Sequence, residues 1–176
     1  MEFTEEMHID CPSDTVFDLM ADVRNVTRWN DSVSQAELTS SEPIGQGSRF
    51  ITVNKIQQQD VTITTFDRPE RLDFTVTGKR MDVPSTFTFA EADGGTTLVF
   101  AFDLQPKGLM SVLFPLLKPM IRRDLKKHHA NFKKLCETQA GRAEIQLWPW
   151  VPSSYLENTG LRRTAGRNLE PRVSGC

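Results

Sequence analysis

Two adjacent histidines, His128 and His129, are the side chains of this 176-residue sequence best suited to moving a proton near neutral pH. Neighbouring residues on a helix diverge by about 100°, so the two imidazoles cannot act as a pair. His128 lies four residues after Asp124, with which it could pair. His129 belongs to an apolar stripe with spacings of three and four residues, and we expect it to face the interior, as ordinary packing or as a polar contact. The other members of the stripe are Ile121, Leu125, Phe132 and Cys136.

Two arginines could recognise an anionic group, because a guanidinium offers a carboxylate or phosphate two parallel hydrogen bonds. Arg49 lies in a strand-like stretch whose inward face is ambiguous. Phe50 favours one face, whereas Ile51 and Val53 favour the face that carries Arg49. Arg80 lies beside an expected turn, where a solvated side chain is the simpler interpretation. Arg49 is therefore kept as a candidate ligand contact, and Arg80 is not.

Other chemistries lack their usual motifs. The sequence has no Gly-rich phosphate loop, no HExxH motif, no nucleophile elbow and no cluster of His and Cys ligands, so we expect no metal and no cofactor. A formal net charge of -2, and a basic helix without interleaved aromatic residues, argue against nucleic acid as a partner. Three isolated cysteines, and an N-terminus without an apolar signal segment, predict a cytoplasmic protein without a disulfide framework.

The elements that must position these residues follow from the hydrophobic periodicity. We expect a first strand over residues 3–10, a helix from Ser13, and a second short helix or turn that ends at Trp29. Short turns join six further strands over residues 33–42, 48–56, 61–66, 72–77, 83–91 and 98–104. A long helix follows from residue 108 to about residue 138. The short connections predict an antiparallel meander, and the first strand should pair with the last.

Large apolar side chains alternate along the last predicted strands and share one face of the sheet with Leu72 and Leu98. The phenylalanines among them are Phe74, Phe87, Phe89, Phe100 and Phe102. Such a face can line a cavity or fill a core, and the sequence does not decide between the two.

In the order and spacing of several stretches, the sequence resembles the polyketide cyclase/dehydrase and lipid-transport branch of the START-like (SRPBCC) superfamily. These stretches are IDCPSDTVFDLMADVRNVTRWN, GQGSRF, FDRPERLDF, FTFAEADGGTTLVFAFDL and PLLKPMIRRDLKKHHANFKKLCE. The resemblance covers residues 1–139 and implies an α+β helix-grip fold. In that fold a seven-stranded curved antiparallel sheet wraps around a long C-terminal helix, with two short helices after the first strand. It implies a hydrophobic cavity between sheet and helix but no reaction, because the superfamily includes both enzymes and carriers.

The function that the resemblance implies is binding of a small hydrophobic ligand, a lipid or a polyketide-like molecule, in that cavity. Trp29, which in the resembling proteins packs near the cavity, is a candidate contact, with ordinary core packing as the alternative. The alternative function is a cyclase/dehydrase-type enzyme that uses His129 or Arg49 in the same cavity, although we assign no catalytic residue. The full set of candidate ligand contacts is Trp29, Arg49, Phe74, Phe87, Phe89, Phe100, Phe102, Leu125, His129 and Phe132.

The C-terminal stretch 140–176 shows no period of a helix or a strand. We therefore expect the domain to end at residue 139 and an irregular, poorly ordered tail to follow it. Trp148 and Trp150 are apolar enough to pack on the domain or on a partner.

The stretch Leu109–Leu117 is strongly apolar but too short to span a bilayer. Pro115 and Pro119 should bend or break the helix there. Basic residues flank the stretch, which could therefore contact an anionic membrane transiently through Phe114 and Leu117. Packing over the sheet, or in a homodimer, is the alternative.

Overall fold

The structure is a computed structural model that describes residues 2–55 and 57–146, with side chains as far as residue 141. One compact unit comprises Met1–Glu137, and the description below concerns this unit. The elements in chain order are β1 (Glu2–Ile9), α1 (Ser13–Ala21), the 3-10 helix η1 (Val23–Arg28), β2 (Val33–Leu38), β3 (Arg49–Asn54), β4 (Gln58–Asp67), β5 (Arg71–Gly78), β6 (Met81–Ala92), β7 (Gly95–Asp103), β8 (Gln105–Pro106) and α2 (Leu109–Gln146).

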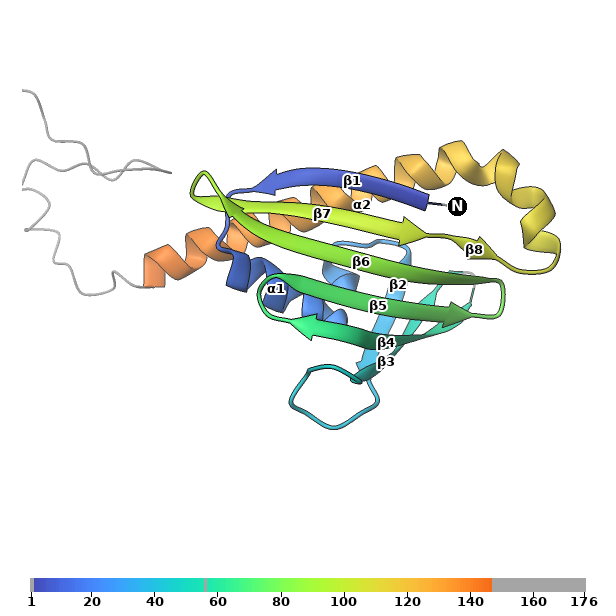
Figure 1. The fold of residues 1–176 in the computed structure, drawn as a ribbon, viewed down its shortest axis with the longest axis horizontal. Coiled ribbons are helices and arrows are strands. Elements are labelled where there is room, and N and C mark those ends of the chain that lie inside the picture. The colour runs from blue at the N-terminus through green and yellow to red at the C-terminus, as the bar shows by residue number, and fades with distance from the viewer. Residues whose placement is uncertain (1, 56, 147–176) are drawn as a thin grey trace, which may run out of the picture. The chain divides into compact units, whose positions relative to one another are not determined.

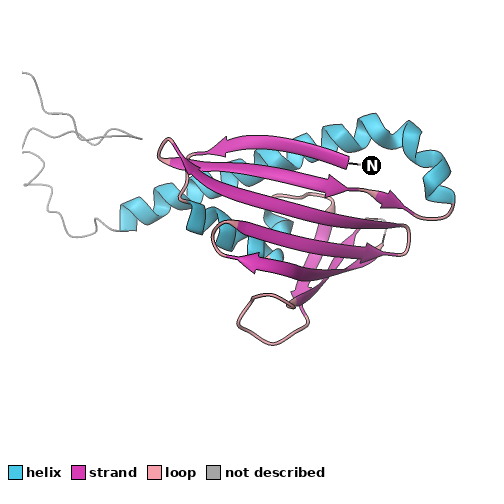
Figure 2. Cartoon of the chain, in the orientation of Figure 1, coloured by secondary structure: helices cyan, strands magenta, loops and turns pink. Residues whose placement is uncertain are grey.

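The strands form an antiparallel sheet in the order β1-β7-β6-β5-β4-β3-β2, and the short β8 pairs with β6. Strand β1 lies beside β7, with Phe3 opposite Phe102, as predicted for the first and last long strands. The sheet curls so that β2 and β3 cross behind the other strands, and α2 runs along one of its faces (Figures 1 and 2). The predicted helix-grip fold with seven strands in its main sheet is therefore confirmed, with β8 as an addition.

Alternation along the strands directs the large side chains of the central sheet toward the helices. Leu72 of β5 lies opposite Phe87 of β6, which in turn lies opposite Phe100 of β7. All three side chains are at most 5% exposed. Such cross-strand pairs hold neighbouring strands in register, because a slip of one residue would turn every ring to the other face.

The β6–β7 connection is the predicted tight hairpin. Asp93 and Gly94 both have positive φ, at 49° and 79°. Two consecutive positive φ angles are typical of the type I′ turn, whose twist matches that of the paired strands. The Asp-Gly sequence suits this turn because glycine carries no Cβ. At Gly95 a side chain would collide with the carbonyl oxygen of Ile9 in β1. This close approach lets β1 lie directly against the end of the hairpin.

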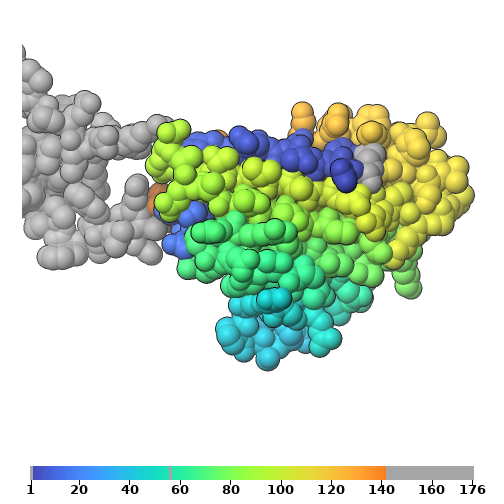
Figure 3. Space-filling view, viewed as in Figure 1, coloured from blue at the N-terminus to red at the C-terminus, as the bar shows by residue number. Residues whose placement is uncertain are grey.

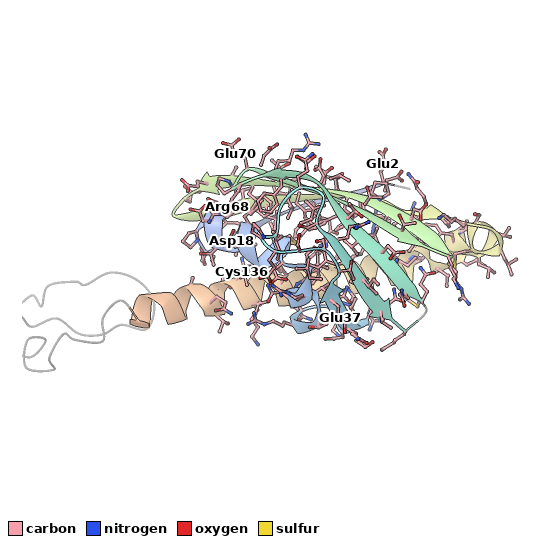
Figure 4. All side chains as sticks on the ribbon, turned by 90° about the horizontal axis from the view of Figure 1, so that it is seen from below. Glu2, Asp18, Glu37, Arg68, Glu70 and Cys136 are labelled. Carbon is pink, nitrogen blue, oxygen red and sulfur yellow. The ribbon has the colours of Figure 1, made fainter. Side chains whose placement is uncertain are left out.

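Helix α1 covers one end of the sheet. Its Phe17 is fully buried and contacts the rings of Phe66 and Phe89, with centroids 5.1 and 5.3 Å away. On its outer side, Asp18 accepts two hydrogen bonds, of 2.7 and 2.9 Å, from Arg68 of the β4–β5 turn. Figure 4 labels both residues on the same side of the molecule. Because this pair is exposed, the buried ring of Phe17 contributes more to the position of α1 than the ion pair does.

Helix α2 bends in the region of its two prolines, as predicted, and extends further than predicted at its C-terminal end. It contains Pro115 and Pro119 without a break, although Figure 1 shows its axis bending in the first turns. At the other end it continues to Gln146, so residues 140–146 are helical rather than irregular. Ala140 and the Arg, Ala and Glu residues that follow Gly141 are good helix formers, and their propensity was underestimated. The rest of the predicted tail, with Trp148 and Trp150, lies outside the described residues.

Candidate ligand-binding site

A histidine and a glutamate form a polar pair between α2 and the sheet, in which the imidazole is buried and the carboxylate side chain is 29% exposed. His129 of α2 is 5% exposed, and its Nδ1 lies 2.8 Å from Oε2 of Glu5 in β1. Glu5 reaches the helix because it shares the inward face of β1 with Phe3 and Ile9, which are both buried. When Glu5 is ionised its oxygens can only accept hydrogen bonds, so Nδ1 carries the proton and Nε2 is the basic nitrogen.

Aromatic rings surround this pair. The imidazole of His129 stacks on Phe100, with centroids 4.1 Å apart and planes 9° apart, and also on Phe102 at 5.8 Å. Phe87 meets Phe100 and Phe102 edge to face at 5.7 and 5.5 Å, and Phe74 meets Phe87 at 5.6 Å. We call this set, Phe74, Phe87, Phe100, Phe102 and His129, the aromatic layer. It runs from β5 across the sheet to α2.

The apolar surroundings change the acidity of the histidine. Burial lowers the pKa of His129 below its ordinary value, and the hydrogen bond and charge of Glu5 oppose that shift. Burial also lowers the pKa of His128, against the opposing charges of Asp124 and Asp31. Both imidazoles are therefore held in the neutral form at neutral pH, in which His129 can donate one hydrogen bond and accept another.

Trp29 contacts the inward face of α2 beyond the aromatic layer. Its ring meets Phe132 at 5.4 Å, and its backbone oxygen accepts a hydrogen bond of 3.1 Å from Nδ2 of Asn131. Phe132 is fully buried, whereas Trp29 is only partly buried. These two candidate contacts therefore lie together, and Phe132 belongs to the same helix as His129.

The structure separates three other candidates from the aromatic layer. Phe89 packs against Phe17 under α1. Leu125 is half-buried and contacts the cluster of Phe3, Leu104 and Phe114. Arg49 is exposed on the sheet's outer face, so of the two placements that the sequence left open the outward one holds, and Arg49 does not reach the aromatic layer.

The ambiguity at Arg49 has a physical cause in the pattern of β3. Phe50 and Thr52 are 1% and 5% exposed, and they define the inward face of this strand. Ile51 and Val53 occupy the outer face but are half-buried there, so both faces of β3 carry apolar residues and alternation alone could not identify the inner one. The aromatic Phe50, opposite Val61 of β4, was the more informative signal.

Glu5 is the site residue that sequence analysis missed. It occurs between Phe3 and Met7 on the inward side of the first predicted strand. An acidic residue on the apolar face of a strand signals a buried partner, because an unpaired carboxylate is costly to desolvate. The partner could not be named, because His129 is separated from Glu5 by 124 positions in the sequence.

The aromatic layer is packed rather than hollow in this structure, as its ring distances show. A surface hollow of about 370 Å³ is lined instead by Pro12 and by residues of the β6–β7 hairpin.

The described residues contain no group of three or more His, Cys, Asp or Glu side chains that could hold a metal ion. Cys11 and Cys136 are buried thiols, and burial raises the pKa of Cys11 to about 11, so it is a poor nucleophile at neutral pH.

Residues 1–137 match the family model described as polyketide cyclase/dehydrase and lipid transport. The chain belongs to this family. No curated protein matches the sequence. Among solved structures, a START superfamily protein from Mycobacterium smegmatis is similar with a TM-score of 0.61 at 11% identity, over 81% of this chain and 98% of that protein.

Two further similar structures give the same picture of the fold of this polyketide cyclase/dehydrase and lipid-transport family member. The di-domain ARO/CYC protein BexL from the BE-7585A biosynthetic pathway has a TM-score of 0.61 at 17% identity, over 80% of this chain and 50% of BexL. Protein BH1534 from Bacillus halodurans has a TM-score of 0.61 at 15% identity, over 78% of this chain and 97% of that protein. At these identities the similarities establish a shared fold, and the function must be argued from the site.

Proposed function

We propose that this protein binds a small hydrophobic ligand, lipid-like or polyketide-like, between the sheet and α2. The observation that carries the proposal is the aromatic layer with one neutral, hydrogen-bonding imidazole at its centre. Binding sites for small apolar molecules commonly combine aromatic walls with a few polar groups that fix the orientation of the ligand. The family description, which names polyketides and lipid transport, supports the same class of ligand.

The packing of the layer defines how such a ligand would bind. Because the rings of Phe87, Phe100 and His129 contact one another, a ligand has to replace ring–ring contacts instead of filling an open hole. A flat or aromatic ligand replaces them at the lowest cost, since offset and edge-to-face contacts are worth about 0.5–1.5 kcal/mol beyond the buried area. A carbonyl or hydroxyl on the ligand would meet the imidazole of His129.

A thermal-shift panel tests this proposal. The panel contains fatty acids, sterols and aromatic polyketides, with native mass spectrometry as the second readout. A ligand at 100 times its Kd should stabilise the protein by about 2.7 kcal/mol. Phe100→Leu should weaken binding, whereas the matched Phe89→Leu, which removes an equally buried ring under α1, should leave it unchanged. If no panel member shifts the melting temperature and the protein is empty in mass spectra, the proposal is wrong.

A second candidate function is cyclisation of a polyketide-like substrate in the same layer. The specific observation in its favour is the 2.8 Å contact of Glu5 with Nδ1 of His129, which fixes the tautomer with a basic Nε2. In an aldol closure, such a base takes a proton from a carbon between two carbonyls. That carbon then bonds to a distant carbonyl carbon, whose oxygen is protonated, and water can leave from the product.

Product analysis separates the two functions. Wild type, His129→Gln and the control His128→Gln are incubated with a linear poly-β-ketone surrogate, and cyclised product is measured by mass spectrometry. If the protein is an enzyme, cyclisation should be faster with wild type than in buffer alone. The rate should then fall by about 100-fold or more in His129→Gln but not in His128→Gln. Binding of the surrogate without any acceleration would exclude the enzyme and leave the binding function intact.

A further inference from the structure

The first turns of α2 carry an exposed apolar surface. Every large hydrophobic side chain that is exposed in the described part of the chain lies here, and we call these residues the apolar tip. They are Leu109 at 76%, Val112 at 73%, Leu113 at 45%, Leu116 at 80% and Met120 at 56% exposed. Scattered exposed hydrophobic residues are common, but their concentration on one stretch of one helix is not. Figure 3 shows this part of α2, in yellow, at the surface of the molecule.

The apolar tip forms one face of the helix, and a separate face anchors it. The spacings from Leu109 through Leu116 to Met120 are those of a single helical stripe. Phe114 lies on another face and is 5% exposed, in a cluster with Phe3 and Leu104. Phe114 was predicted to be a membrane contact, but in this arrangement it is buried and fixes the helix to the sheet. The anchored helix directs the apolar tip outward.

Basic residues continue the same stripe. Arg123 and Lys127 follow Met120 at spacings of three and four residues, and Lys118 and Lys126 are exposed beside them. Across residues 118–127, five basic side chains face Asp124 as the single acidic one.

Acidic groups on neighbouring elements neutralise only part of this charge. Asp31 pairs with Lys127 at 2.6 Å, and Asp82 pairs with Lys107 at 2.7 Å. Arg122 lies over the ring of Phe3 at 5.6 Å. Within residues 2–55 and 57–141, no carboxylate forms a salt bridge with Lys118, Arg123 or Lys126, so these three cations face solvent. An apolar surface thus lies next to uncompensated positive charge.

We propose that the apolar tip docks on an anionic lipid bilayer. Leu109, Val112 and Leu116 would insert at the boundary of headgroups and acyl chains, with Lys118, Arg123 and Lys126 at the lipid phosphates. The tip is about 16 Å long at 1.5 Å per residue, and a helix that lies in the plane of the interface buries its apolar face to a depth of about 5–10 Å. Among the described residues no helix is long and apolar enough to cross a bilayer, and docking requires none to do so. The docking surface does not depend on the proposed ligand site.

A second copy of the chain fits this surface less well. Two tips packed face to face would bring Arg123 and Lys118 of both copies together, and like charges across an interface cost several kcal/mol. An anionic bilayer instead complements both the apolar and the basic part.

Co-sedimentation with lipid vesicles tests the docking. The full chain is mixed with phosphatidylcholine vesicles that do or do not contain phosphatidylserine, at low and high salt and without ligand. We expect binding only with phosphatidylserine, and weaker binding at high salt because the charges are exposed. The double variant Arg123→Gln/Lys126→Gln should bind the vesicles with a partition coefficient about 25-fold lower, at about fivefold per charge removed. The matched control Arg49→Gln on β3 should bind as wild type does. Val112→Ser/Leu116→Ser should lose about tenfold or more.

Each other outcome overturns the proposal. Wild type that stays in the supernatant at low salt excludes docking. Binding that falls in the charge variant but not in the Val112→Ser/Leu116→Ser variant is electrostatic adsorption without insertion. A wild-type dimer in sedimentation velocity that Val112→Ser/Leu116→Ser converts to monomer, without vesicle binding, assigns the surface to a second copy. Because no ligand is present, a failure here leaves the ligand-binding proposal untouched, and a failed ligand panel leaves this test unaffected.

Discussion

The two halves of α2 meet opposite surroundings. In the second half, His129, Phe132 and Cys136 are 5% exposed or less and face the sheet and η1. In the first half, Leu116 is 80% exposed although it is as apolar as any residue of the core. Burial along this helix therefore follows the position of the sheet, not the hydrophobicity of the side chains. The same helix can therefore close a binding layer with one half and present a separate surface with the other.

Phe132→Ala should have the largest effect on stability. The ring is fully buried against Trp29, and its loss leaves a cavity, so we expect about 3–5 kcal/mol less free energy of unfolding. Urea denaturation measures it. A loss below about 1 kcal/mol would mean that the second half of α2 is not packed as described, and the contrast between the halves would disappear.

The Glu5–His129 pair should show measurable coupling. Glu5→Leu leaves a buried imidazole N–H unpaired, and we expect a loss of about 1–3 kcal/mol. His129→Phe keeps a stacking ring, so a double-mutant cycle with Glu5→Leu isolates the pair, with a coupling energy of about 0.5–3 kcal/mol. Glu6→Leu, on the exposed side of β1, is the matched control and should cost less than about 0.5 kcal/mol. Additive single effects would show that the pair contributes nothing specific.

Mild acid should destabilise the protein through its buried histidines. The folded-state pKa of His129 is lowered below the ordinary 6.5, and the same holds for His128. As the pH falls, the unfolded chain therefore takes up protons at a higher pH than the folded chain does. The free energy of unfolding keeps its full value above pH 6.5 and decreases as the pH falls from 6.5 toward the folded-state pKa. The slope should reach at most about 1.4 kcal/mol per pH unit for each histidine.

Denaturation at several pH values checks this slope. Carboxyl groups with a lowered pKa, such as those of Asp31 and Asp82, have an ordinary pKa of 3.8. Their contribution to the pH dependence of stability therefore lies below the pH range in which the histidines titrate. His129→Phe should flatten the dependence just below pH 6.5. Unchanged pH dependence in this variant would show that His129 is not held neutral by burial.

The smallest effect is expected in the first half of α2. Leu116→Ser replaces a side chain that is 80% exposed, so stability should change by less than about 0.5 kcal/mol. Thermal unfolding measures it. A loss of 2 kcal/mol or more, comparable to a core substitution at about 2–5 kcal/mol, would show that Leu116 is covered in solution.

The sequence carried more information about the fold than about the site. Alternation at Leu72 and Phe74 and the Asp93-Gly94 turn predicted the strands and the hairpin correctly, because period and turn chemistry are local. Trp29 and Phe132 were both singled out, but their contact depends on a tertiary arrangement that no local pattern encodes. The face that carries Arg49 stayed ambiguous for a different reason, since both faces of β3 carry apolar residues.

Glu5 marks the limit of local inference most clearly. Its position on an apolar face could be read from the chain, but the identity of its partner could not. The exposure of Leu116 could not be assigned either, because the apolar stretch of α2 offers several faces, and only the position of Phe3 and Leu104 selects Phe114 for burial. The sequence predicted an exposed apolar region there without showing which residues form it.

The pairing of β1 with β7 also constrains the order in which the protein can be completed. As the chain leaves the ribosome, β1 emerges first, yet its partner residues 96–103 and the helix that supplies His129 come late. Until then the inward side of β1, with Glu5, has no neighbour to pair with. The contact between Glu5 and His129 closes a loop spanning 124 positions, and contacts of such long range form slowly. The aromatic layer therefore cannot be complete until the chain as far as His129 is available, although the strands that carry its phenylalanines come earlier in the chain.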